Sequence, residues 1–405
     1  YIFALAIQLL SIYWSGSRGP LIGLTAALFS FILVLLVSLR NLAGERDSFR
    51  SKDALLAFLP VIPPLLALLI SGVVAGATSP MVSFALFLGS AALSLGLILL
   101  LVVLRRGWTW LWLSWLLLTT LMAGWLLLFN IPTNSLARTV DFPLIGNLFE
   151  AQIEWKELPK VGSYGRMLDP SQTRGREKSN RVRVLIWQGV VDLISPHTPL
   201  TFPDGSTDRL NFWRPLIGYG PESMYVAYNR FYPAELATVE ARNASPDRSH
   251  NETFDAFVIT GLAGFLAWQA LYISVFYFGF KYLGVVRSRR DKFMLIGAWV
   301  GGALLGAILS FTLIDPIYLG VAIPTGTILG LIFYLFYYAL FSRSAAPQGK
   351  GQSQLLAFQT DHLLVNAMLA AVLAHYVEVH FGIAVAATRL HFFLFVALIF
   401  VIAYK

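Results

Sequence analysis

The sequence predicts an all-α polytopic membrane protein, and its composition, its long apolar runs and its loop charges lead to that prediction. Of the 405 residues, 57% are hydrophobic and only 13% are charged, and the mean hydropathy is +0.67. Soluble domains contain a smaller apolar share, because a water-soluble fold cannot bury so much apolar surface. The chain has no Cys, which excludes disulfides, thiolate metal sites and Cys nucleophiles.

Apolar stretches in the sequence predict about ten membrane helices, since crossing ~30 Å of hydrocarbon takes about 20 helical residues. Helices are favoured over barrel strands, because these stretches lack the two-residue alternation of a barrel. Pro60, Pro63 and Pro64 predict a kink or break in the third stretch. The stretches cover residues 1–14, 20–39, 54–76, 81–104, 108–130, 254–280, 293–314, 317–341, 362–381 and 389–404.

Basic residues in the short connections predict the orientation of these helices. They gather in four connections that lie on one side if the helices alternate, which makes that side cytoplasmic. The net charge of +8 fits this bias of membrane loops, so it does not indicate a nucleic-acid partner. The four connections are residues 40–52, 105–106, 287–292 and 343–350.

This orientation divides the chain into three parts. We expect five membrane helices in residues 1–130, an extracytoplasmic loop domain in residues 131–252, and five more helices in residues 253–405. The chain begins within an apolar run at Tyr1, so we expect the first helix to be truncated. Acidic and basic residues nearly balance in the loop domain, which argues against a polyanion-binding domain.

Polar clusters on the predicted outer side contain the first candidate site residues. Arg18 lies between the first two helices, where a helix N-terminus favours anions. It could equally be an interfacial arginine that reaches toward the headgroups. The next cluster combines guanidinium groups with a Gly-Tyr-Gly-Pro turn that could offer backbone N–H groups to phosphate, although salt bridges within the loop are the alternative. Its candidates are Arg183, Trp187, Arg214, Gly218, Gly220 and Glu222.

A third cluster places His250 and Asn251 directly before an apolar helix. A histidine near its usual pKa can exchange protons at neutral pH, but it can also serve as a helix cap or an interfacial polar group. A weaker candidate pairs His375 with Glu378 on one helix face. Two ligands do not make a metal site, so we expect no metal; ionisable groups near a helix end still suggest a polar cavity.

In this order along the chain, the clusters resemble the motifs of the O-antigen ligase and O-antigen polymerase superfamily of bacterial integral membrane glycosyltransferases. Ser17-Arg18-Gly19 is similar to the first motif of that family. Arg183–Trp187 and Pro215–Gly220 are similar to the second. His250-Asn251 followed by Gly261–Gly264 is similar to the third.

The resemblance implies an enzyme that moves a glycan from a polyprenyl-diphosphate carrier to an acceptor hydroxyl, in polysaccharide biosynthesis for the bacterial cell envelope. Arg18 and Arg183 would stabilise the diphosphate and His250 would orient or deprotonate the acceptor. Partners would be the lipid-linked glycan donor, a glycan acceptor and membrane lipids of the inner (plasma) membrane, with no cofactor. Substrate-binding residues would be Arg214, Trp187, Gly218, Gly220, Glu222, Asn251, His375 and Glu378.

A non-catalytic or transporter-like membrane subunit of a larger assembly is the alternative. Transporters place functional charges near the bilayer midplane, in broken helices. Here the charged candidates cluster on the outer side, which favours the transferase. That mechanism requires Arg18, Arg183 and His250 to meet at one outward-facing site, although nothing local in the sequence brings them together.

The predicted topology can be checked by labelling single cysteines, since the natural chain has none. A cysteine at Ser171 should react with a membrane-impermeant reagent from outside the cell, because residues 131–252 are predicted to be extracytoplasmic. A cysteine at Ser51 should react only after the membrane is opened. Labelling of both positions from outside would contradict this topology.

Overall fold

The computed structural model confirms the all-α class. In the described part of the chain every regular element is a helix, apart from an isolated bridge between Thr201 and Thr207. Six of the described helices are long and apolar enough to cross a membrane, so the protein is membrane-embedded. The structure describes residues 2–15, 18–42, 55–56, 58–73, 78–104, 106–130, 153–156, 158, 178–241, 244–341 and 360–404.

The chain forms two compact units, which differ from the three predicted parts. The first unit comprises Tyr1–Ser38, Lys178–Arg343 and Ser353–Lys405, and the second comprises Leu39–Glu177 and Ser344–Gln352. The predicted loop domain, residues 131–252, is therefore shared between them. The physical reason is that α10, which begins at Lys178, packs against α14 of the first unit.

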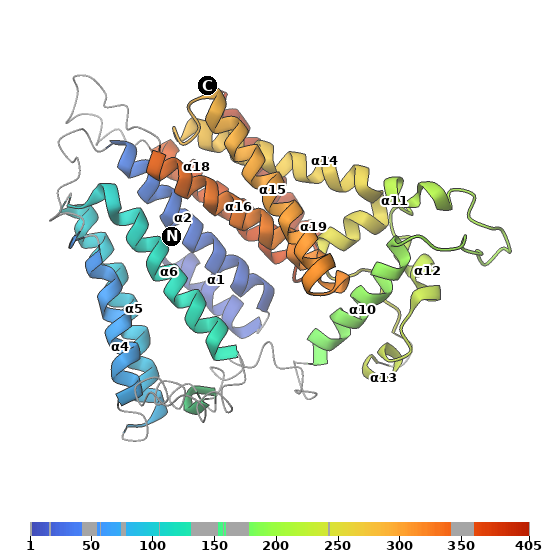
Figure 1. The fold of residues 1–405 in the computed structure, drawn as a ribbon, viewed down its shortest axis with the longest axis horizontal. Coiled ribbons are helices and arrows are strands. Elements are labelled where there is room, and N and C mark those ends of the chain that lie inside the picture. Colours follow the sequence, from blue (N-terminus) through green and yellow to red (C-terminus); the bar gives the residue numbers. More distant parts are fainter. Residues whose placement is uncertain are drawn as a thin grey trace. The chain divides into compact units, whose positions relative to one another are not determined.

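The first unit contains all the residues of the candidate site, and its longer helices are labelled in Figure 1. Its longer helices are α1 (Ile2–Ser15), α2 (Arg18–Leu42, whose last residues pass into the second unit), α10 (Lys178–Ile194), α14 (Glu252–Tyr282), α15 (Arg289–Leu313), α16 (Leu319–Phe341), α18 (Thr360–Glu378) and α19 (Ala386–Ala403). Its short helices are η4 (Asn211–Trp213), α11 (Arg214–Ile217), α12 (Met224–Ala227), η5 (Tyr228–Phe231), α13 (Leu236–Val239) and η6 (Pro316–Tyr318).

The second unit packs its helices around a buried tryptophan. Trp155 is fully buried and donates its indole N–H to the hydroxyl of Ser83, with 2.7 Å between the two atoms. The predicted break at the prolines is confirmed, because a 3-10 turn precedes an α-helix that has Pro63 and Pro64 in its first turn, where a missing N–H costs little. The helices of this unit are η2 (Leu59–Val61), α4 (Ile62–Val73), α5 (Pro80–Val103) and α6 (Trp108–Asn130).

Helices α15 and α16 pack with their backbones in direct contact. A Cβ atom on Gly302 would lie 2.1 Å from the carbonyl oxygen of Gly326, and one on Gly330 would lie 2.0 Å from that of Ala298. Small residues allow the two backbones to approach this closely. In a membrane the hydrophobic effect does not drive helices together, so the dispersion attraction of close packing stabilises the pair instead. Glycine therefore holds this helix pair together.

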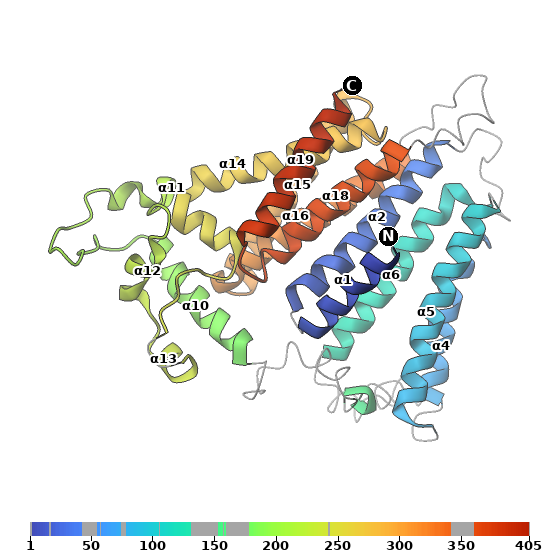
Figure 2. The same ribbon diagram turned by 180° about the vertical axis from the view of Figure 1, so that it is seen from behind.

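The break in α14 is the main departure from the sequence prediction of one uninterrupted helix over residues 254–280. Gly261 has φ 63° and ψ −167°, and α14 bends there beside α11 (Figures 1 and 2). The bend leaves the carbonyls of Val258 and Ile259 without helical partners. The N–H of Tyr219 donates to Val258 at 2.7 Å, and the N–H of Gly220 donates to Ile259 at 3.0 Å.

Glycines on both sides make this contact possible. A Cβ on Gly218 would lie 2.4 Å from the carbonyl carbon of Ile259, and one on Gly261 would lie 2.3 Å from that of Leu216. Both glycines also have positive φ, which side-chain-bearing residues rarely adopt. The second and third sequence motifs therefore meet through their backbones.

The α15–α16 contact predicts different outcomes for neighbouring glycines. Gly302→Ala should destabilise the protein by about 1–3 kcal/mol, because the new methyl group requires a backbone shift. Gly301→Ala is the matched control, since the space beside it is open and alanine is the better helix former. The free energy of unfolding of both variants is measured in mixed detergent micelles. Equal stability of the two variants would contradict the backbone contact between α15 and α16.

Candidate functional site

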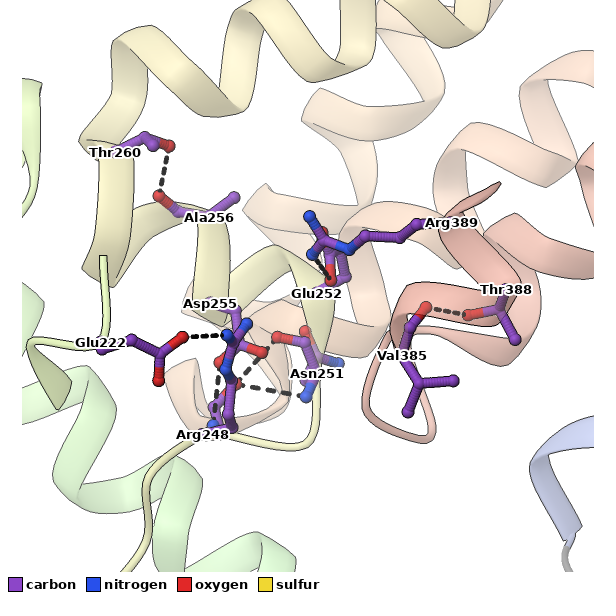
Figure 3. A network of polar contacts seen from close by, with 11 residues as sticks. Glu222, Arg248, Asn251, Glu252, Asp255, Ala256, Thr260, Val385, Thr388 and Arg389 are labelled. Atoms are coloured by element: carbon purple, nitrogen blue, oxygen red, sulfur yellow. Dashed lines mark hydrogen bonds and ion pairs between the residues drawn. The ribbon is translucent and has the colours of Figure 1, made fainter. Parts of the chain in front are cut away.

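The candidate site surrounds the turn that leads into α14 (Figure 3). Asn251 caps this helix, because its Oδ1 accepts the N–H of Phe254 at 3.2 Å. Its Nδ2 donates to the carbonyls of Gly320 and His380, both at 2.9 Å. One fully buried amide therefore joins the start of α14, the start of α16 and the end of α18.

The residue before His250 is held equally firmly. The carboxylate oxygen Oδ1 of Asp255 accepts the backbone N–H of Ser249 at 2.8 Å and the hydroxyl of Ser249 at 2.7 Å. The carbonyl of Ser249 accepts the indole N–H of Trp187 at 2.9 Å, which joins α10 to the turn. Because Ser249 and Asn251 are both fixed, the backbone of His250 lies between two anchored neighbours.

His250 adopts the left-handed conformation, with φ 59°, and its half-buried imidazole has no hydrogen-bond partner within the described residues. Burial lowers the pKa of His250 and the charge of Arg183 lowers it further, while the nearby acidic residues, first of all Asp255, oppose this shift. A histidine with a lowered pKa is neutral at pH 7, so it can accept a proton. The strained conformation is also typical of functional residues.

Two ion pairs flank the turn. Arg389, in the first turn of α19, donates through Nη2 to both carboxylate oxygens of Glu252, at 2.9 and 3.2 Å. Its Nε and Nη1 have no partner in the described part of the chain, and 40% of its side chain is exposed. On the other side, Arg248 pairs with Glu222 at 2.6 Å. Figure 3 shows both pairs beside Asn251.

Of the three predicted catalytic residues, the structure places Arg183 near His250 and the backbone of Arg18 beside the end of α18. Arg183 lies on α10, close enough for its charge to act on His250. The backbone of Arg18 begins α2, and the next residue, Gly19, packs against the end of α18, where its Cβ would lie 3.7 Å from the carbonyl oxygen of Phe381. That position adjoins His380, which binds Asn251. The side chain of Arg18 is outside the described part.

Arg214 and the glycine turn serve the fold instead of offering groups to an anion. The guanidinium of Arg214 makes a two-pronged contact with buried Asp208, at 2.8 and 2.9 Å, and also donates to the carbonyl of Gly218 at 3.0 Å. The N–H groups of Gly218, Tyr219 and Gly220 all donate to backbone carbonyls. The expectation that this turn exposes N–H groups to phosphate is therefore corrected, since the carbonyls of Arg214, Val258 and Ile259 already accept them.

The remaining predicted residues, His375 and Glu378, lie on the last turn of α18. His375 stacks on Phe392, with 5.1 Å between the ring centroids, and its buried Nε2 has no hydrogen-bond partner among the residues that the structure describes. Glu378 ends α18, and its Cγ lies near Gly19. The described residues contain no group of three or more His, Cys, Asp or Glu side chains that could hold a metal ion.

Sequence reasoning missed Arg389, Asp255 and the contact between His380 and Thr253. The Nε2 of His380 lies 3.0 Å from the hydroxyl of Thr253, inside the first turn of α14. A signal for Arg389 was present, because it is the one Asp, Glu, Lys or Arg residue between Ala386 and Ala403. Charges in membrane helices usually mark functional or paired positions.

The fold and the site define an all-α membrane protein with a polar site at one end of a helix bundle. Searches of protein-family models, curated proteins and solved structures find no match for this chain. The assignment of function therefore depends on the site itself.

The Asp208–Arg214 pair makes a prediction about acid stability. Arg214 lowers the pKa of Asp208, so the pair stabilises the fold above the unfolded-state pKa, and this stability is lost as the pH falls through the lower, folded-state pKa. Asp208→Asn should therefore reduce hydrogen-exchange protection of residues 218–220 at pH 7, in keeping with the ~3–5 kcal/mol cost of leaving a buried charge unpaired.

Toward acid pH the difference between Asp208→Asn and the natural chain should shrink, because the natural Asp208 also becomes neutral. Asp204→Asn, in an exposed turn of the same loop, is the control and should leave protection of residues 218–220 unchanged. Equal protection in all three proteins at pH 7 would show that the pair does not hold this segment.

Proposed function

We propose that this protein is a membrane glycosyltransferase that moves a glycan from a polyprenyl-diphosphate carrier to an acceptor hydroxyl. The observation that carries the proposal is the position of His250, a left-handed, half-buried histidine with a lowered pKa and with the charge of Arg183 acting on it. This arrangement suits a general base that works beside a negatively charged leaving group.

In the proposed reaction the acceptor oxygen attacks the anomeric carbon of the donor glycan. A new carbon–oxygen bond forms, the bond from that carbon to the diphosphate oxygen breaks, and the polyprenyl diphosphate leaves with the electron pair. His250 takes the proton of the acceptor hydroxyl. The glycan is already activated by its diphosphate, so stabilising the negative charge of the leaving group is the main remaining task.

Arginines would stabilise that charge. Arg183 and Arg18 are the first choices, and the structure adds Arg389, whose Nε and Nη1 have no partner in the described part of the chain. Glu252 would bind the remaining guanidinium nitrogen of Arg389, Nη2, and so orient the guanidinium. Arg214 is a weaker choice, because Asp208 and Gly218 already occupy its donors. We propose no metal, since guanidinium groups bind phosphate directly.

The topology proposed for this function is about ten membrane helices in the bacterial inner membrane, with the loop domain of residues 131–252 and the site on the extracytoplasmic face. The loop-charge pattern supports this orientation. The bend of α14 argues against the transporter-like alternative, because the carbonyls that it frees are bound by Tyr219 and Gly220 and do not line an ion path.

Substitutions at His250 and Arg183 separate catalysis from binding. His250→Ala should reduce glycan transfer roughly 10²–10⁴-fold, the usual contribution of a general base, and should leave binding of the lipid-linked donor intact. Arg183→Ala should weaken donor binding itself. A purified polyprenyl-diphosphate oligosaccharide serves as donor, with transfer and binding measured separately and with His391→Ala and Arg290→Ala as controls outside the site.

The pH profile and a chelator complete this test. In a plot of transfer rate against pH, Arg183→Gln should shift the low-pH side of the curve to higher pH, because the pKa of His250 rises when the nearby positive charge is lost. Arg183→Lys keeps the charge, so its curve should match that of the natural protein. A chelator should not change the rate. Transfer by His250→Ala at the natural rate would refute the mechanism, and activity restored by a divalent ion after chelation would direct attention to His375 and Glu378.

A further inference from the structure

The segment Leu210–Ile217, which contains η4 and α11, exposes a run of large apolar side chains. Phe212 is 84% exposed and Trp213 is 51% exposed, and three more apolar residues of the segment are also exposed. A surface in water rarely shows so many large apolar side chains together unless another partner covers them. The three are Leu210, Leu216 and Ile217.

The place of this segment along α14 sets its depth relative to a membrane. Its end is bonded to the bend of α14 through Tyr219 and Gly220, and both views show α11 beside that bend (Figures 1 and 2). The part of α14 after the bend, Leu262–Tyr282, has about 21 residues, or ~31 Å at 1.5 Å per residue. That length matches the ~30 Å hydrocarbon core, so the bend lies at the edge of the core.

The exposed apolar surface continues from the segment Leu210–Ile217 onto α14. Leu262 and Leu266, the leucines that follow the bend in α14, are both exposed as expected for a lipid-facing helix surface. In this segment the Oδ1 of Asn211 has no hydrogen-bond partner within the described residues, whereas Arg214 binds Asp208 and the carbonyl of Arg214 accepts the N–H of Gly218. The segment can therefore lie against lipid without leaving the charge of Arg214 unpaired.

From these observations we infer that Leu210–Ile217 is an interfacial anchor whose partner is the lipid bilayer, at the boundary between headgroups and acyl chains. Phe212 and Trp213 insert at this boundary, which is the level where aromatic side chains concentrate in membrane proteins. The inference places this part of the predicted loop domain, residues 131–252, against the membrane surface. It does not depend on the proposed transferase activity.

The anchor also has a consequence for the site. The segment continues directly into Tyr219 and Gly220, which hold the bend of α14, and the first turns of α14 hold Asn251 and Glu252. A lipid contact at Phe212 therefore fixes one end of the backbone connection that leads to His250. The membrane surface, through this connection, positions the site.

Spin labels on single cysteines test the anchor in the whole protein, because the natural chain has no Cys. Phe212→Cys and the matched control Asp204→Cys, in an exposed polar turn of the same loop, are labelled and reconstituted in vesicles of phosphatidylethanolamine and phosphatidylglycerol. The label at residue 212 should collide more with oxygen, which concentrates in lipid, than with a water-soluble nickel chelate. The label at residue 204 should show the reverse ratio.

A second position keeps the test decisive if Phe212→Cys does not fold. Trp213→Cys should give the same lipid pattern as Phe212→Cys. Collision with the nickel chelate at residues 212 and 213 as strong as at residue 204 would place the segment in water and overturn the inference. Protection from both reagents would also overturn it, because a protein partner or a second copy of the chain would then cover the segment.

Discussion

The side-chain amide of Asn251 is the interaction on which the geometry of the site depends. Its oxygen caps α14, and its nitrogen donates to the carbonyl of Gly320 at the start of α16 and to that of His380 just after α18. A buried amide that satisfied only part of its hydrogen bonds would cost free energy, so the three helix ends can meet in few arrangements. The position of His250 follows, because it is the residue next to this fixed point.

Close backbone packing provides the rigid frame around that point. Gly302 and Gly326 let α15 and α16 touch, and Gly218 and Gly261 let the loop bind the bent α14. In each case glycine removes a side chain that would keep two backbones apart, and at the bend of α14 the N–H groups of Tyr219 and Gly220 bond the freed carbonyls again. The frame is therefore held by shape and by hydrogen bonds, as a bundle in lipid requires.

The charged side chains form ion pairs that differ in how much of each guanidinium group is occupied. Asp208 fully engages Arg214 in the loop, whereas Glu252 holds Arg389 through one nitrogen and leaves that side chain partly exposed. Burial and Arg183 keep His250 neutral. A neutral base under the charge of Arg183, with a partly exposed arginine at the same helix start, is the combination that transfer from a diphosphate would need.

The sequence by itself determined the membrane class, the places of the apolar helices and the break near Pro63. These features follow from local composition, since hydropathy and proline geometry act within a few residues. Only the tertiary structure decided that Arg214 is paired with Asp208, that Gly218 docks on Gly261, that Arg389 joins the site and that Phe212 is exposed beside the bend. Each of these depends on which surfaces of the folded helices meet, and contacts between residues as distant as Glu252 and Arg389 leave no pattern along the chain.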